Sequence, residues 1–84
     1  MKNNNKETHH ELFPADGRKS FYGKAYTVTD ADGCETLYSY NTPIILRKGG
    51  RLVRLWGGWS MTTGRHIAAF CGLNKAGFFA LPMA

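Results

Sequence analysis

Glycine-containing turns divide the middle of the chain into short segments that are rich in aromatic and β-branched residues. The four segments are Ser20–Thr29, Glu35–Thr42, Ile44–Arg47 and Arg51–Trp56. Asp30-Ala31-Asp32-Gly33 separates the first pair, and Gly49-Gly50 lies between the last pair. Turns of this kind join adjacent antiparallel strands, and two glycines suit a type I′ turn because both of its central residues have positive φ. The pattern predicts an antiparallel β-meander of about four strands.

The length of the first loop determines which side chains share a face of the sheet. We expect a loop of two or four residues, and with either length Tyr26 and Val28 lie on the same face as Leu37. The opposite face then carries Phe21, Ala25, Thr27, Tyr38 and Tyr40. Both faces are therefore substantially apolar, and one of them needs cover from another element.

The second hairpin concentrates positive charge at its tip. With a two-residue loop, Lys48 lies opposite Arg51 and Ile45 lies opposite Arg54. Like charges directly opposite each other destabilise a sheet by a few tenths to about 1 kcal/mol. Because nothing within the hairpin itself favours these facing like charges, we expect this tip to be a contact surface.

A helix should follow the last strand. Ser60, Thr62 and Thr63 are residues that cap helix N-termini, and the helix proper is predicted from Gly64 to about Gly72. Ile67, Phe70 and Cys71 would form its apolar stripe, while Gly72 or Gly77 would supply the left-handed residue that ends it. The apolar segment Phe78–Ala84 is expected to be a short added strand or a contact for a partner. The predicted fold is α+β, a small antiparallel meander packed against one C-terminal α-helix.

A chain of 84 residues has room for one core. Residues 1–19 are polar and are predicted to be a largely disordered tail, followed by a single domain over residues 20–84. Leu12 and Phe13 are expected to dock onto that domain. Residues 1–6 are followed by polar residues instead of the apolar stretch of a signal peptide, and no apolar segment approaches the ~20 residues that span a bilayer. We therefore expect a cytoplasmic protein that does not enter a membrane.

The charges are distributed unevenly along the chain. All six acidic residues lie in the first 35 positions of a chain whose net charge is +5. From Thr36 to Ala84 there are only basic charges, carried by Arg47, Lys48, Arg51, Arg54, Arg65 and Lys75. This asymmetry favours an anionic partner, either nucleic acid or an acidic protein surface, although a solvated basic face without a partner is the alternative.

Catalytic patterns are missing from the sequence. Cys71 follows His66 by five positions on the same helix, so their side chains point about 140° apart. Cys34 and Cys71 are interpreted as reduced thiols, and His9-His10 supplies too few ligands for a specific metal site. His66 is expected to be a buried histidine whose ring bonds a strand carbonyl. We predict no enzymatic activity, no cofactor and no metal.

The helix N-terminus beside Arg65 is a second place where an anion could bind, but we favour the alternative that Ser60, Thr62 and Thr63 satisfy its free N–H groups as caps. Single-stranded nucleic acid is usually held by aromatic residues interleaved with basic ones. Tyr38 and Tyr40 stand among basic residues, as do two tryptophans. The candidate contact residues are Arg47, Lys48, Arg51, Arg54, Trp56, Trp59 and Arg65.

Three stretches, Ser20–Ala25, Leu37–Pro43 and Trp59–Ile67, together with Phe70, resemble a family of small uncharacterised proteins. These proteins occur in Gram-positive gut bacteria and in their phages and plasmids, and the similarity covers roughly Lys19 to Phe70. Because the family has no assigned activity, the resemblance implies no catalytic or binding residues. It implies a context, since small proteins of mobile elements are often accessory binders or inhibitors of host machinery, of which anti-CRISPR proteins are the best-known type.

Two functions follow from these patterns. The first is a non-enzymatic binding module with a basic surface that takes up nucleic acid. The alternative is an accessory protein of a phage or mobile element that binds or inhibits a host protein or nucleoprotein complex. A homodimer through a sheet edge is a further expectation, because the apolar segment from Phe78 could pair with the edge strand of a second copy.

Overall fold

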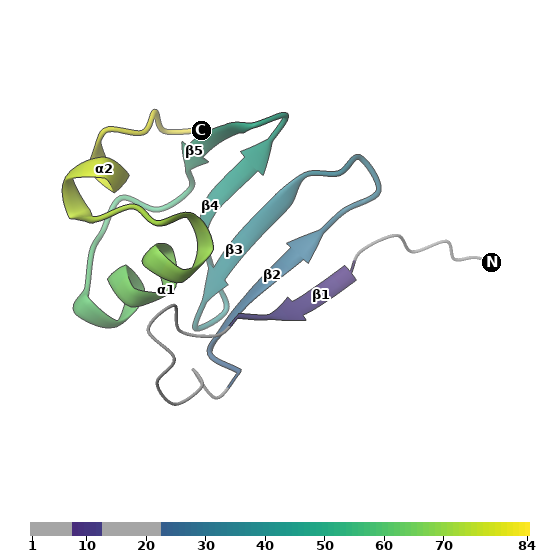
Figure 1. Cartoon of the computed structure of the whole chain (residues 1–84), viewed down its shortest axis with the longest axis horizontal. Helices are drawn as coiled ribbons and strands as arrows, with labels where there is room; N and C mark the ends of the chain where they lie inside the picture. The colour runs from purple at the N-terminus through teal and green to yellow at the C-terminus, as the bar shows by residue number, and fades with distance from the viewer. Residues whose placement is uncertain (1–7, 13–22) are drawn as a thin grey trace.

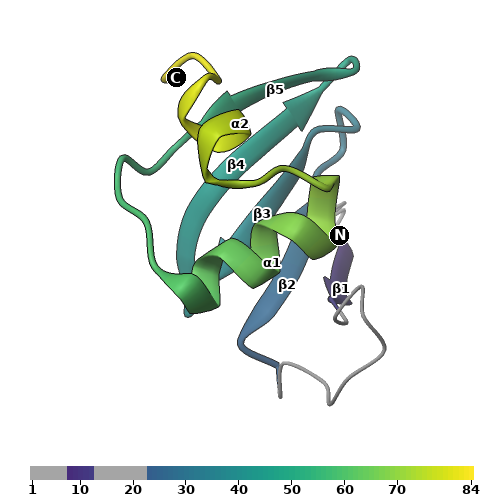
Figure 2. The ribbon, with the colours of Figure 1, turned by 60° about the vertical axis from the view of Figure 1, so that its left-hand side comes forward.

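The computed structural model describes residues 8–12 and 23–84, and it contains one antiparallel sheet in the order β1-β2-β3-β4-β5. The strands are β1 (Thr8–Glu11), β2 (Ala25–Thr29), β3 (Glu35–Ser39), β4 (Thr42–Lys48) and β5 (Arg51–Arg54). Helices α1 (Met61–Cys71) and α2 (Lys75–Phe79) follow and lie on the same face of the sheet (Figures 1 and 2). The predicted α+β meander is confirmed, with five strands where about four were expected and with a second short helix.

Strand β1 lies inside the segment that was predicted to be a largely disordered tail. It pairs antiparallel with β2, with Thr8 opposite Thr29 and Glu11 opposite Tyr26. Its side chains are exposed, so no apolar pattern marks the strand in the sequence. Leu12 packs against the core as expected, and its N–H donates to the Ala25 carbonyl at 3.0 Å. Phe13 and the remainder of the tail lie outside the described residues.

The register of the first hairpin differs by one residue from the predicted register. Thr27 lies opposite Leu37 and Tyr26 lies opposite Tyr38, so the prediction that Tyr26 shares a face with Leu37 is wrong. The reason is a three-residue loop between Asp30 and Cys34, whose backbones bond at 3.0 Å. An odd loop length moves the register by one residue and exchanges the two faces.

The side chain of Asp30 and the backbone of Gly33 stabilise this loop. Asp30 Oδ1 accepts the N–H groups of Asp32 and Cys34 at 2.9 and 3.0 Å. Gly33 has φ of +84°, a left-handed conformation that glycine adopts without strain. Together these features define a turn that ends in a left-handed residue, which is the common form of three-residue hairpin loops.

The second hairpin has the predicted register, with Lys48 opposite Arg51 and Ile45 opposite Arg54. Gly49 and Gly50 both have positive φ, at 58° and 81°. A register shift between β3 and β4 at Leu37/Tyr38 accompanies the burial of the consecutive residues Ile44 and Ile45. A bulge of this kind allows two neighbouring side chains to enter the same core.

Helix α1 begins three residues before the predicted Gly64. Ser60 is its N-cap, with Oγ accepting the Thr63 N–H at 3.0 Å, and Gly72 ends it with φ of +77°. The core between the helices and the sheet consists of Leu37, Ile44, Ile45, Ile67, Phe70 and Phe78.

The apolar end of the chain enters this core through α2. Asn74 caps α2 by accepting the Gly77 N–H at 2.8 Å, and Phe78 is fully buried. The expected added strand is reduced to an isolated parallel bridge between Arg54 and Met83. The last residues therefore bond to the edge of β5 in their own chain.

Candidate functional site

Arg47 and Arg54 of the basic hairpin make contacts within the protein. Arg47 Nη1 lies 2.8 Å from Glu35 Oε1, Nη2 donates to the Phe70 carbonyl at 3.0 Å, and the guanidinium lies 4.3 Å from the Phe70 ring centroid. Arg54 Nε donates to the Leu81 carbonyl at 3.0 Å. Arg47 lies two positions from Ile45 on β4, and Arg54 lies opposite Ile45 on β5, so both side chains are on the sheet face that carries Ile45 and faces the helices. Both arginines hold the C-terminal half of the chain to the sheet.

Lys48 and Arg51 belong to the other face. They lie opposite each other at the exposed tip, three positions from Ile45 and Arg54 respectively. Because side chains alternate between faces along a strand, both are directed away from the helices. Of the four basic hairpin candidates, these two remain for a partner on the open face, by which we mean the sheet face opposite α1 and α2.

The open face carries a row of stacked rings from three adjacent strands. His9 and Tyr26 have centroids 6.0 Å apart with planes inclined by 8°, and Tyr26 and Tyr38 are 5.2 Å apart and inclined by 3°. Both tyrosines are half-buried, and the Tyr26 hydroxyl donates to Asn41 Oδ1 at 2.9 Å. The rings therefore have a defined orientation on the sheet surface.

An apolar strip connects the rings to the basic tip. Val28, Thr36, Leu46 and Val53 lie in register across four strands on the open face. Beyond them, a hollow of about 510 Å³ is lined by Leu46, Lys48, Gly49, Arg51, Leu52, Val53 and Pro82. Tyr38 and Lys48 are four strand positions apart, which corresponds to about 13 Å.

The side chains of Trp56 and Trp59 do not lie on the open face, because both pack against the core on the helical side of the sheet. A Cβ at Gly58 would lie 2.6 Å from Trp56 Cζ2, and a Cβ at Gly64 would lie 2.5 Å from Trp59 Cζ2. The Trp59 ring also lies 5.7 Å from the Phe78 ring. The predicted site residues therefore separate into internal contacts, the hairpin tip and the surroundings of Trp59.

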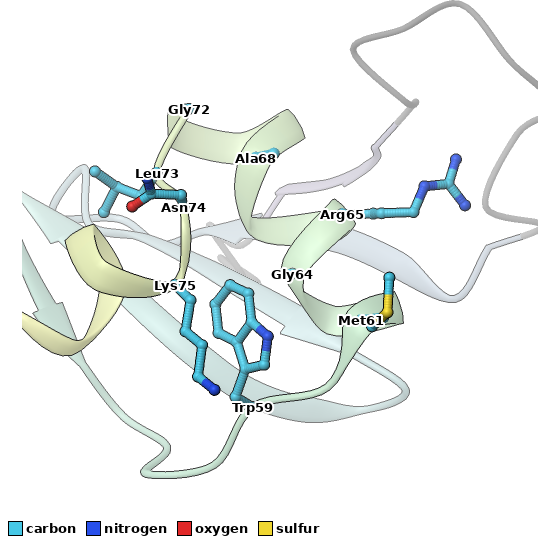
Figure 3. A pocket seen from close by; sticks show the side chains of 9 residues that line it. All are labelled: Trp59, Met61, Gly64, Arg65, Ala68, Gly72, Leu73, Asn74 and Lys75. Carbon is cyan, nitrogen blue, oxygen red and sulfur yellow. The ribbon is translucent and has the colours of Figure 1, made fainter.

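Trp59 and Arg65 line a second hollow of about 510 Å³, between α1 and the start of α2 (Figure 3). Ser60 caps the helix N-terminus near Arg65. Of the two alternatives for this N-terminus, an anion site or capping by hydroxyl residues, the structure contains the cap. This hollow lies on the helical side of the sheet, whereas the ring row lies on the open face.

A buried polar cluster connects α1 to β3. His66 is 1% exposed, and its Nδ1 lies 2.8 Å from Ser39 Oγ, which in turn lies 3.1 Å from Thr63 Oγ1. Burial lowers the pKa of His66 below 6.5, and the charge of Arg65 lowers it further. The expected burial of His66 is confirmed. Ser39 is 2% exposed, so its hydroxyl is shielded from solvent, and the cluster joins α1 to β3. No sequence signal marked Ser39.

Cys34 and Cys71 are free thiols, and burial raises the pKa of Cys71. Within residues 8–12 and 23–84, no group of three or more His, Cys, Asp or Glu side chains is placed to hold a metal ion. In the same part of the chain, neither helix is long and apolar enough to cross a membrane.

These features define a small α+β domain in which two helices cover one face of the sheet and aromatic and basic residues occupy the other. Residues 11–77 match the model of a family of unknown function, DUF8033, and the chain belongs to that family. No curated protein and no solved structure matches the chain. The family match confirms that the chain is a member of an uncharacterised family.

Proposed function

We propose that the protein is a non-enzymatic module that binds single-stranded nucleic acid on the open face. The observation that carries this proposal is the near-parallel row of His9, Tyr26 and Tyr38 beside an apolar strip that ends at Lys48 and Arg51. Bases stack on aromatic side chains of this kind, and each stacked base contributes about 1–3 kcal/mol.

The charges indicate how a strand would lie. Phosphates would contact Lys48 and Arg51, while bases would contact the rings about 13 Å away. Glu11 lies opposite Tyr26 at the ring end, which favours bases over phosphates there. Because rings stack with every base, we expect little sequence preference.

Oligonucleotide binding followed by fluorescence anisotropy tests the proposal. Tyr38→Leu retains an apolar side chain but removes a ring, and should weaken binding at least about fivefold. Tyr40→Leu, at a tyrosine that contacts His66 outside the row, is the matched control. If two phosphates are contacted, log K should fall with log salt at a slope of about −1.4. Absence of binding at low salt, or equal effects of the two variants, would contradict the proposal.

A second candidate function is that of a phage or mobile-element accessory protein that acts on a host protein or nucleoprotein complex in the cytoplasm. The observation that favours it is the Trp59 hollow on the helical side, which offers a protein partner a surface separate from the open face. Pull-down from host lysate with the wild-type chain, compared with a variant altered in the Trp59 hollow, tests it. Equal recovery with both would count against this use of the hollow.

A further inference from the structure

We infer that β1 is the edge through which a second copy of this chain pairs, so that two sheets join into one continuous antiparallel sheet about a two-fold axis. Figure 1 shows β1 at one edge of the sheet and β5 at the other. The chain covers part of the β5 edge itself, because the Arg54 N–H donates to the Pro82 carbonyl at 2.7 Å and the Arg54 carbonyl accepts the Ala84 N–H at 2.8 Å. An uncovered edge is a template for another strand, which directs attention to β1.

The hydrogen bonds to β2 determine which backbone groups of β1 face outward. The Leu12 N–H donates to the Ala25 carbonyl at 3.0 Å, so the backbone of Leu12 is directed toward β2. Because this direction alternates along an antiparallel strand, the backbone of His10 also points toward β2, whereas the backbones of His9 and Glu11 point away from it. No residue in the described part of the chain bonds to these outward groups, so they are available to another strand.

The edge of β1 is complementary to itself in one register. When His9 lies opposite Glu11 of a second copy, the two-fold axis repeats the pair, and every outward group of both residues is bonded. A shift by two residues places either His9 or Glu11 opposite itself and leaves the other residue without a partner in the second β1. Directly opposed carboxylates also destabilise a sheet, whereas an imidazole beside a carboxylate does not. This register therefore favours a second copy as the occupant.

The same register aligns the open faces of the two copies. His9 stacks on Tyr26, so its side chain lies on the open face, and Glu11, two positions along the strand, lies on that face too. Residues opposite each other in antiparallel strands share a face, so pairing His9 with Glu11 of the second copy places both open faces on one side and all helices on the other. The ring rows of both copies then share one surface, and each copy supplies a carboxylate beside His9 of the other.

Sedimentation velocity of the full chain, from low micromolar to millimolar concentration, tests the dimer. Strands of four residues form a small interface, so we expect a weak dimer that assembles reversibly as the concentration rises. Glu11→Pro blocks the edge, because it removes an outward N–H and leaves the hydrogen bonds between β1 and β2 in place. It should raise the dissociation constant of the dimer at least about tenfold, since each copy loses a donor. Circular dichroism checks that the variant is folded.

Cysteine crosslinking determines the register, in a background where Cys34→Ala and Cys71→Ala remove the native thiols. His10→Cys should form a disulfide-linked dimer under mild oxidation, because position 10 lies opposite itself with Cα atoms about 4.5 Å apart. His9→Cys alone should not crosslink, because the same position in the second copy lies beyond the limit of about 7 Å. A mixture of His9→Cys and Glu11→Cys chains should crosslink, because those positions face each other.

Met61→Cys, at a position that is 85% exposed on α1, controls for random collision. If it crosslinks as fast as His10→Cys, or if Glu11→Pro leaves the dimer unchanged, β1 is not the interface. A chain that stays monomeric at every concentration overturns the inference and leaves the β1 edge to a strand of another protein. Crosslinking of His9→Cys alone overturns the inferred register. The proposed function fails separately, since a dimer that binds no oligonucleotide would refute only that proposal.

Discussion

Replacing Gly64 by alanine should destabilise the protein, although the same change in an exposed helix interior usually stabilises one. Alanine favours a helix by roughly 0.5–1 kcal/mol relative to glycine. At position 64, however, the new Cβ would lie 2.5 Å from Cζ2 and 3.0 Å from Cη2 of Trp59. Either the indole or the helix has to move, and overpacking of this kind costs typically 1–3 kcal/mol.

The balance of these two effects is a net loss of about 1 kcal/mol, which corresponds to a fall in Tm of about 4–8 °C for a domain of this size. Urea and thermal denaturation measure the loss, and tryptophan fluorescence reports the displaced indole. Gly77→Ala is the comparison, because its Cβ would meet the terminal Leu73 Cδ2 at 3.1 Å, a group that can shift. We expect a smaller effect there.

A double-mutant cycle isolates the cause. In a Trp59→Leu background the obstructing ring is absent, so Gly64→Ala should stabilise that variant by about 0.5–1 kcal/mol. The sign of the effect would therefore reverse between the two backgrounds. If Gly64→Ala stabilises the wild-type chain, or destabilises both backgrounds equally, the contact between Trp59 and Gly64 does not control this position.

Other predictions concern acid stability, the sheet–helix contact and the open face. Since burial lowers the pKa of His66 below 6.5, stability should be complete above about pH 6.5 and fall as the pH drops toward the folded-state pKa. A His66→Gln variant, compared by denaturation across pH, should lose this part of the slope, and an unchanged slope would argue against it. Arg47→Ala should cost roughly 1–2 kcal/mol in chemical denaturation, because it removes the bond to the Phe70 carbonyl and the packing on that ring. Glu35→Gln should cost less than about 1 kcal/mol because the ion pair is partly exposed, and equal losses would mean that the ion pair dominates. Glu11→Gln should strengthen oligonucleotide binding at low salt by removing a negative charge beside Tyr26, and weaker binding would place the strand elsewhere.

Local chemistry accounts for the parts of the fold that the sequence predicted. Gly49 and Gly50 adopt the positive φ of a tight turn, and the predicted opposition of Lys48 and Arg51 follows from the two-residue loop. Ser60 and Gly72 end α1 through atoms only three or four residues away. Such contacts depend on immediate neighbours, so a pattern within a short window is sufficient to predict them.

Strand β1 and helix α2 were missed for a different reason. Every side chain of β1 is exposed, so the strand is defined by backbone pairing with β2 and by no apolar pattern. In α2 a short segment becomes helical because Asn74 caps it and Phe78 fills the core. Short elements of this kind gain their stability from tertiary packing.

The candidate site also combines features that the local sequence predicts with features that only tertiary packing decides. The sequence from Thr36 onward contains basic residues and no acidic ones, but the sequence could not tell which of these cations make contacts within the protein. Arg47 reaches Phe70, 23 positions away, and Arg54 reaches Leu81, 27 positions away. Partners so distant in the chain meet only when α1 and the C-terminal segment pack on the sheet.

By itself the sequence determined an α+β meander, the register of the second hairpin, the approximate C-terminus of α1 and the distribution of charge along the chain. Tertiary structure alone decided which face Tyr26 and Tyr38 occupy, because one residue of loop length exchanges the two faces of a hairpin. It also decided that Trp59 forms the wall of a hollow, because that requires Gly64 and Phe78 to pack against the same ring. Turns and caps are satisfied by neighbouring atoms, whereas faces and hollows depend on how separate elements pack together.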